Sequence, residues 1–275
     1  MKRTTGSIAY DYIDPTGNIT ILVTTPVEES ERARIASEIM KDERECEQVG
    51  YVIGRNNEGI DIAMAAGEFC GNAVMSAAAL YCDDRGMGSG EEKIVKVNCT
   101  GCDHTLSVYI TQESNHVYGG RVTMPIPVKI SEHKFEYDNN TYTLPLAEFD
   151  GISHVIATAD ELPLADEDIE NAARKWCTDL GADCAGIMLM QKNDENEADD
   201  AGEGVYRTVI RPVVYAPSVG TCYWESSCAS GTTASFVYLA GKMNIKRLVA
   251  KEPGGVLEVS YDDSGSPVLE GHVRL

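Results

Sequence analysis

Two stretches of this sequence, GEFCGNAVMSAAA at residues 67–79 and WESSCASGTTASF at residues 224–236, share one design. Each places a cysteine, Cys70 or Cys228, directly before a run of small and apolar residues. Such a run predicts a buried helix, and each cysteine then lies at the N-terminus of its helix. One such unit in each half of the chain indicates an internal repeat of topology.

Runs that alternate apolar and polar residues flank both cysteine stretches and predict β-strands. The run PVEESERARIASEIMKDERECEQ at residues 26–48 has apolar residues at helical spacing and predicts an amphipathic helix. MPIP at residues 124–127 interrupts the alternation, because proline has no N–H for a sheet ladder. We therefore expect two domains, 1–121 and 122–265, with the strand 266–275 as a candidate to complete the first.

The charge balance excludes some classes of partner. Lys and Arg total 23 against 44 Asp and Glu, a formal net charge of −21, which repels a nucleic-acid backbone. Much of the excess lies at residues 193–204, which we interpret as a solvated loop rather than a cation site. The sequence has neither a membrane-length apolar run nor a signal peptide, so we expect a cytoplasmic protein without a membrane partner, and a homodimer stays open.

The nine cysteines are odd in number and irregularly spaced, which argues against a disulfide framework and for reduced thiols. Cys99-x-x-Cys102 followed by His104 resembles half of a metal site, but no second pair stands at a matching spacing. We therefore expect no metal, and a zinc-binding protein stays as the alternative from another class. Most free cysteines are buried core residues, which is the structural interpretation to weigh against any catalytic one.

A cysteine at a helix N-terminus ionises more readily, because the helix begins with unpaired N–H groups and a partial positive charge. The same N–H groups bind a carboxylate, and small residues such as Gly71 and Gly231 let a ligand approach them. If Cys70 and Cys228 flank the α-carbon of one amino acid, one thiolate removes the α-hydrogen and the opposite thiol returns a proton. This chemistry inverts the α-carbon without a cofactor.

At these stretches the sequence resembles the diaminopimelate epimerase superfamily of cofactor-independent racemases and epimerases. CGN at residues 70–72 is similar to its first cysteine motif, and CASGT at residues 228–232 to its second. The agreement is closer with one branch, the histidine racemases of staphylopine-type metallophore biosynthesis. The shared motifs, in order along nearly the whole chain, are DPTGNITILV (14–23), CEQVGY (46–51), GEFCGNAVMS (67–76), WESSCASGTTAS (224–235) and EPGG (252–255).

The resemblance implies an α+β fold of two pseudo-symmetric domains, each a β-barrel-like sheet around a central helix, with the active site in the interdomain cleft. It implies Cys70 and Cys228 as the proton-transfer pair and a small amino-acid substrate. The other residues it suggests for substrate binding are Asn18, Gln48, Gly71, Asn72, His154, Ser230 and Gly231. Glu68 and Glu225, just before the two cysteines, are candidates to hold the substrate ammonium group, with a surface or capping role as the alternative.

The sequence departs from diaminopimelate epimerases before the second cysteine. Those enzymes carry a Glu-Arg pair that binds the far carboxylate of diaminopimelate, whereas YWESSC has Glu225 without the arginine. We therefore expect histidine rather than diaminopimelate as the substrate. Diaminopimelate, another amino acid, and a binding protein that does not exchange the α-hydrogen stay as alternatives. Tyr223 and Trp224 are candidates to flank an imidazole ring or to pack in the core.

Overall fold

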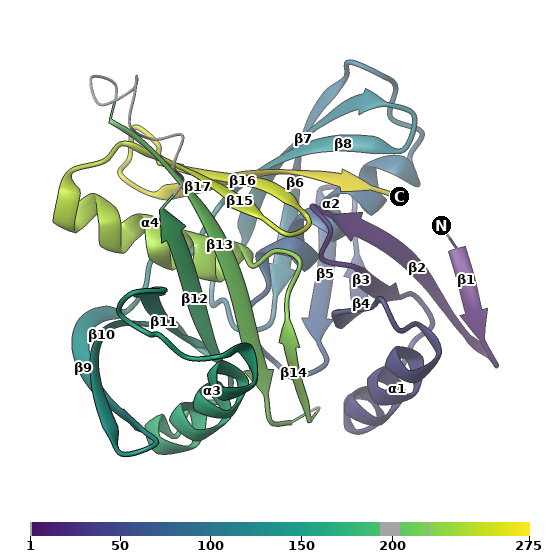
Figure 1. The fold of residues 1–275 in the computed structure, drawn as a ribbon. Coiled ribbons are helices and arrows are strands. Elements are labelled where there is room, and N and C mark those ends of the chain that lie inside the picture. The colour runs from purple at the N-terminus through teal and green to yellow at the C-terminus, as the bar shows by residue number, and fades with distance from the viewer. Residues whose placement is uncertain (1, 193–203, 219) are drawn as a thin grey trace. The chain divides into compact units, whose positions relative to one another are not determined.

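The computed structural model describes residues 2–192, 204–218 and 220–275. These residues form two compact units, Met1–Thr123 together with Glu270–Leu275, and Met124–Leu269 (Figure 1). The acidic segment predicted to be a solvated loop lies, except for Gly204, outside the described residues. No helix in the described part of the chain is long and apolar enough to cross a membrane.

The first unit alternates strands with two crossover helices. Its elements are β1 (Lys2–Thr5), β2 (Ile8–Pro15), β3 (Thr20–Val23), α1 (Glu29–Asp42), β4 (Gln48–Arg55), β5 (Gly59–Met64), α2 (Gly71–Asp83), β6 (Glu92–Cys99), β7 (Leu106–Ser114) and β8 (Val117–Thr123). The last strand of the chain, β17 (Pro267–Arg274), enters this unit from Glu270 onward.

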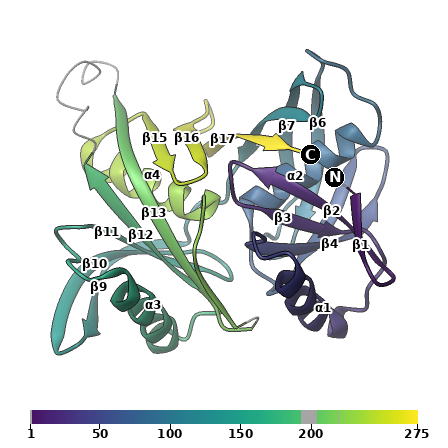
Figure 2. The same cartoon turned by 45° about the vertical axis from the view of Figure 1, so that its right-hand side comes forward.

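The sheet of the first unit closes on itself. Strand β3 pairs antiparallel with β2 and parallel with β4, β5 pairs antiparallel with β4 and parallel with β6, and β6, β7 and β8 form a meander. Strand β17 pairs with both β8 and β2, which completes the ring. Helix α2 contacts β2, β3 and β5–β8 and lies inside this ring, whereas α1 lies outside against β4 (Figure 2).

The composition of α2 suits this central position. Every residue from Gly71 to Cys82 is buried, and most of them are alanine or other small residues that let strands approach the helix from all sides. A helix that is apolar all round belongs in a core, whereas α1 buries only Ile35, Ala36 and Ile39 on one face. The one-sided pattern of α1 and the all-round pattern of α2 therefore explain their places.

The second unit has the same kinds of element. They are β9 (Lys129–Tyr137), β10 (Asn140–Glu148), β11 (Ser153–Thr158), α3 (Asp166–Leu180), β12 (Ala185–Lys192), β13 (Val205–Ala216), β14 (Thr221–Trp224), α4 (Ala229–Met243), β15 (Arg247–Glu252), β16 (Gly255–Tyr261) and the start of β17. Helix α4 contacts β10–β12, β15 and β16, and α3 packs against β9 and β12–β14.

The two units repeat one topology. In the first, the parallel pairs β3–β4 and β5–β6 are joined through α1 and α2. In the second, the parallel pairs β11–β12 and β13–β15 are joined through α3 and α4, and strand β14 is an addition that pairs with β13. The predicted α+β fold of two pseudo-repeated units is confirmed, and α2 corresponds to α4.

Candidate functional site

Cys70 occupies the residue directly before α2. Its backbone is extended, with φ −135° and ψ 109°, and its Sγ accepts a hydrogen bond from the Ala73 N–H at 3.4 Å. A helix N-terminus leaves such N–H groups without intrahelical partners, so the sulfur takes the place that a serine or aspartate oxygen usually has. The predicted position of Cys70 at a helix N-terminus is confirmed.

A polar network holds the Cys70 thiol from the side of the sheet. The thiol donates to Gln48 Oε1 at 2.7 Å. Gln48 Nε2 in turn donates to Asn18 Oδ1 at 2.5 Å and to Thr20 Oγ1 at 2.7 Å, and Asn18 Nδ2 donates to Glu47 Oε2 at 2.8 Å. Thr20 and Gln48 are register partners of the parallel pair β3–β4, which explains why they meet. The structure thus brings together three predicted site residues, Cys70, Gln48 and Asn18.

The segment before Cys70 rests on the turn that follows β6. Thr100 Oγ1 donates to the Glu68 carbonyl at 3.1 Å, and the Cys99 thiol lies against the Cys70 backbone. Burial raises the pKa of Cys99 to about 12, so this thiol is a neutral packing group. Burial also raises the pKa of the Glu68 carboxyl. Among the described residues nothing hydrogen-bonds Glu68 Oε2, a solvent-inaccessible atom.

Cys228 occupies the corresponding residue before α4, with nearly the same backbone angles, φ −130° and ψ 98°. Its surroundings differ from those of Cys70. The Cys228 N–H donates to Glu252 Oε2 at 2.7 Å, and the Thr232 hydroxyl contacts Glu252 Oε1 and the Cys228 carbonyl. Glu252 is buried, and the positive end of the helix dipole compensates its charge.

The Cys228 thiol holds its proton firmly. Burial raises its pKa well above the ordinary value, and the carboxylates of Glu225 and Glu252 raise it further, whereas the Gly231 amide lowers it. Glu225 also hydrogen-bonds the Cys228 side chain. Glu225 therefore lies beside the Cys228 sulfur, and its predicted contact with the substrate stays a prediction.

His154 and Ser230 form a chain that leads from the core to Cys228. His154 Nε2 lies 2.8 Å from Ser230 Oγ, which lies 3.8 Å from Cys228 Sγ. His154 is fully buried and packs edge-on against Phe149, with ring centroids 6.0 Å apart. Burial lowers the pKa of His154 to about 3, so the ring is neutral at physiological pH. His154 thus lies behind Ser230 and is suited to orient its hydroxyl.

Gly231 packs closely against the side chain of Met188, and its predicted role in binding a carboxylate stays a prediction. A Cβ at this position would lie 2.0 Å from Met188 Sδ, in the middle of β12. The other predicted backbone donors, Gly71, Asn72 and Ser230, lie in the first turns of α2 and α4 and are buried. Their N–H groups belong to the helix N-termini that are expected to bind a carboxylate.

Trp224 belongs to the core of the second unit. It packs against the cluster around Trp176, and its Nε1 donates to Glu170 Oε1 at 3.0 Å. The Arg211 guanidinium lies over its ring, 4.3 Å from the centroid. Of the two aromatic candidates for flanking a substrate ring, Trp224 therefore has a packing role, and Tyr223 is exposed.

Sequence reasoning missed Thr20, Thr232 and Glu252. Glu252 had a readable signal, since Leu248, Ala250 and Glu252 alternate along β15 on its buried side. A carboxylate on the buried face of a strand needs a polar partner, and the partner of Glu252 is the N-terminus of α4. Thr20 begins β3, whose four residues are all buried and show no alternation, and Thr232 is marked only by following Cys228 by four residues.

Each unit thus has a thiol directly before the N-terminus of its central helix, next to backbone N–H groups. A thiol can take or give one proton, and the N–H groups stabilise negative charge on a nearby oxygen. Within each unit, these groups suit half of a proton-transfer reaction at a carbon next to a carboxylate.

The sequence comparisons place the chain among racemases. The family model described as the histidine racemase CntK N-terminal domain matches residues 7–273. A protein called histidine racemase from Fusobacterium nucleatum subsp. nucleatum is 30% identical over 267 residues, with 96% of this chain and 92% of its own covered. Another of that name from Staphylococcus aureus is 24% identical over 262 residues, with 92% and 88% covered.

Solved structures share the fold at low identity. A probable proline racemase from Agrobacterium radiobacter K84 superposes with a TM-score of 0.67 and 12% identity, covering 97% of this chain and 90% of its own. A phenazine biosynthesis PhzF family protein from Enterococcus faecalis gives a TM-score of 0.56 and 12% identity, with 100% and 97% covered. These likenesses show the fold.

Proposed function

The chain belongs to the histidine racemase family whose model matches residues 7–273, and from this premise we propose that it interconverts L- and D-histidine with the thiols of Cys70 and Cys228. The chain is an isomerase of the racemase type. Three relatives that carry the name histidine racemase support histidine as the substrate. No cofactor takes part in the proposed reaction.

One observation supports the two-thiol mechanism above the others. The two thiols occupy the same position of the repeated topology, directly before α2 in the first unit and α4 in the second. Their backbone angles are similar, φ −135° and ψ 109° at Cys70 and φ −130° and ψ 98° at Cys228, so both cysteines enter their helices from an extended backbone. The buried Cys82 lies at the far end of α2 and has no such setting.

The proposed step conserves protons and electrons. One cysteine, as thiolate, takes the α-hydrogen as a proton, and the electrons of the broken C–H bond pass into the carboxylate as an enediolate. The other cysteine, as thiol, then delivers its proton to the opposite face of the same carbon. Backbone N–H groups at the helix N-termini stabilise the charge on the carboxylate oxygens. The two sulfurs end with their protonation states exchanged.

The surroundings of Cys228 support a resting role for each sulfur in this proposal. Because burial, Glu225 and Glu252 raise the pKa of Cys228, this residue begins as the proton donor. The base of the first half-reaction is then Cys70, which acts as the thiolate once it has lost the proton that its thiol donates in a hydrogen bond to Gln48 Oε1. The substrate ammonium group, placed near Glu225, would relieve the charge that keeps Cys228 protonated.

The substrate is identified by incubating the reduced protein with each L-amino acid separately in deuterium oxide. The proposal expects deuterium at the α-carbon and loss of optical rotation with histidine. Faster inversion of another amino acid, diaminopimelate included, would overturn histidine as the substrate while leaving the two-thiol chemistry intact. Binding of histidine without α-deuteration would instead indicate a binding protein.

A further inference from the structure

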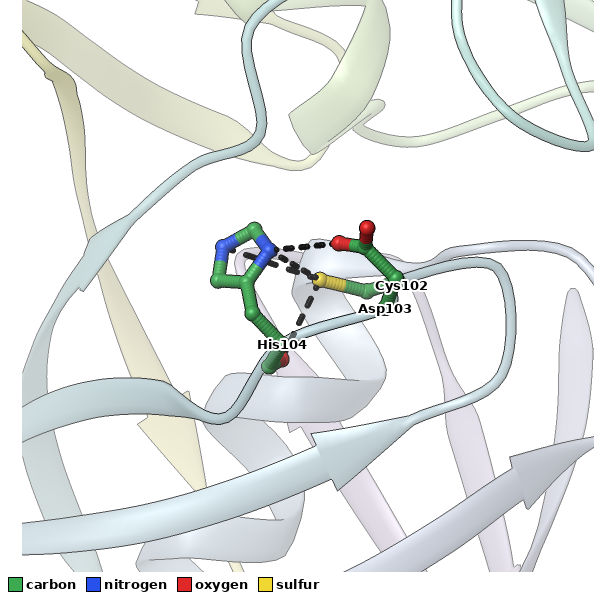
Figure 3. A group of neighbouring side chains, drawn as sticks. All are labelled: Cys102, Asp103 and His104. Carbon is green, nitrogen blue, oxygen red and sulfur yellow. Dashed lines mark hydrogen bonds and ion pairs between the residues drawn. The ribbon is translucent and has the colours of Figure 1, made fainter.

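The loop between β6 and β7 carries three neighbouring side chains with different donor atoms. Cys102, Asp103 and His104 offer sulfur, oxygen and nitrogen atoms that all lie within 4.8 Å of one another (Figure 3). The thiol is half-buried, and the carboxylate and imidazole are exposed. Elsewhere in the part of the chain that the structure describes, no other group of three His, Cys, Asp or Glu side chains meets this criterion.

The distances within this cluster suit a small tetrahedral cation. Cys102 Sγ lies 3.6 Å from His104 Nδ1 and 3.9 Å from Nε2. A zinc ion bound at about 2.3 Å from sulfur and about 2.0–2.1 Å from nitrogen holds these two atoms about 3.6 Å apart in tetrahedral geometry. Asp103 Oδ1 lies 2.9 Å from His104 Nδ1, so this pair needs to separate by only a few tenths of an ångström.

The backbone that carries the cluster is fixed on both sides. Gly101 has φ +69°, and a Cβ there would lie 2.2 Å from the Phe69 nitrogen, so only glycine fits this close approach. Thr100 Oγ1 accepts from the Met64 N–H at 2.9 Å, and Thr105 Oγ1 donates to Asn98 Oδ1 at 2.7 Å. Little backbone order therefore has to be gained when the side chains take up a ligand.

Cys99 does not belong to this cluster, although the sequence spacing suggests a Cys99-x-x-Cys102 pair. Its side chain is 5% exposed and lies against the Cys70 backbone. The three clustered donors are therefore consecutive residues of one loop, and a fourth coordination position is left to solvent. Such a site is open and exchangeable, unlike a closed structural zinc site with four protein ligands.

We propose that Cys102, Asp103 and His104 bind one divalent transition-metal cation of the zinc class. Thiolate and imidazole ligands favour zinc, cobalt or nickel over magnesium and calcium, which prefer oxygen. The three cluster side chains are not the thiols of the proposed histidine chemistry, although their loop packs against Phe69, the residue before Cys70. Its presence or absence leaves the racemase proposal untouched.

The chain offers a matched control for the cluster. His116 Nδ1 lies 2.8 Å from Asp83 Oδ1, and the imidazole is 53% exposed, close to the 57% of His104. This pair has the imidazole and the carboxylate of the cluster but not its thiol. If sulfur completes the site, His116→Ala leaves metal binding unchanged.

The test titrates Co²⁺, a spectroscopic stand-in for zinc, into the reduced, chelator-treated full chain and follows the thiolate-to-cobalt charge-transfer band. Cys70 and Cys222 are the two other thiols that are not buried, so the Cys70→Ser/Cys222→Ser variant serves as the background. In that background we expect one equivalent of Co²⁺, displaced by Zn²⁺ but not by Mg²⁺. Cys102→Ser should abolish the band, and His104→Ala and Asp103→Asn should each weaken binding about tenfold or more.

Three results would overturn the proposal. They are a missing charge-transfer band in the background variant, a band that survives Cys102→Ser, and equal weakening by His104→Ala and His116→Ala. Because Cys102, Asp103 and His104 are not core residues, the variants should keep the thermal unfolding midpoint of the parent. That measurement separates loss of a ligand from loss of the fold.

Discussion

Cys70 and Cys228 have similar backbone conformations but different neighbouring side chains. Both cysteines precede a buried helix with nearly identical backbone angles. Cys70 is half-buried and donates to an uncharged amide, whereas Cys228 is 6% exposed and lies beside the carboxylates of Glu225 and Glu252. The two cysteines thus share a backbone setting, and at Cys228 burial, Glu225 and Glu252 raise the pKa of the thiol.

The difference has a chemical use. A two-base inversion needs one thiolate and one thiol at the same time, and two identical surroundings would not favour either assignment. At Cys228, burial and the carboxylates of Glu225 and Glu252 favour the protonated thiol. The predictions below alter one side of this comparison at a time.

The largest expected effect is the removal of either sulfur. Cys70→Ser and Cys228→Ser should each reduce the rate of histidine inversion at least about a hundredfold, because a hydroxyl is a far weaker acid than a thiol. The rate is followed by circular dichroism of the amino acid. Cys82→Ser is the control, since Cys82 is buried in α2 and should leave the rate within about twofold of the parent. Equal losses in all three variants would indicate a folding defect.

Glu252→Gln should affect only the second unit, with an effect on stability as well as on titration. The amide keeps the size of the side chain but removes a buried negative charge and one acceptor, so we expect a loss of about 1–3 kcal/mol in unfolding free energy. The remaining Cys228 thiol should ionise at lower pH, because Glu252 raises its pKa. The alkaline limb of the pH–rate profile should therefore move to lower pH.

The control for this change is Glu258→Gln, which removes an exposed carboxylate paired with Arg247 in the same unit. It should change the unfolding free energy by no more than about 0.5 kcal/mol, and it should leave the pH–rate profile unchanged. An unchanged profile in Glu252→Gln would contradict the role assigned to the carboxylates.

Gln48→Ala should weaken catalysis by about tenfold, because it removes the acceptor that orients the Cys70 thiol without removing the thiol. The loss should fall on kcat more than on KM. Gln112→Ala, which removes a buried glutamine of the same unit that lies outside the Cys70 network, is the control. If the two variants lose activity equally, the hydrogen bond between Cys70 and Gln48 does not orient the thiol. The difference between the two sulfurs would then depend only on the charges beside Cys228.

The smallest effect at neutral pH concerns His154. Its pKa in the folded chain is about 3, below its ordinary 6.5, so the unfolded chain binds more protons between these values. Stability is therefore full above about pH 6.5 and falls as the pH is lowered toward 3. Urea unfolding at pH 7.5 and 4.5 measures how much unfolding free energy the parent and His154→Asn each lose between these pH values. The loss should be smaller in His154→Asn by up to about 2–3 kcal/mol. An equal drop in both proteins would contradict this burial.

Much of this architecture was readable from the sequence because it depends on local pattern. The helices beginning after Cys70 and Cys228 follow from runs of small and apolar residues, and α1 follows from its one apolar face. The meeting of Cys70, Gln48 and Asn18 followed from family resemblance, since strand register was not derivable from the spacing of these residues.

The rest depends on contacts far apart in the sequence. Glu252 follows Cys228 by 24 residues and reaches it only because β15 returns beside β13. The close packing of Gly231 in α4 against Met188 of β12 was likewise not readable from the sequence. Cys99 and Cys102 look like a metal pair in sequence, yet the turn at Gly101 sends Cys99 into the core. Such outcomes are set by packing that local periodicity does not encode.

In the proposed mechanism each of the two sulfurs carries out one proton transfer. The most direct test measures α-hydrogen exchange in deuterium oxide with the Cys70→Ser and Cys228→Ser variants. L-histidine and D-histidine are supplied separately, and deuterium at the α-carbon is read by NMR. The account predicts that each variant exchanges one enantiomer without inverting it, and that the two variants choose opposite enantiomers. Exchange of the same enantiomer by both variants, or inversion at the parent rate by either, would contradict it.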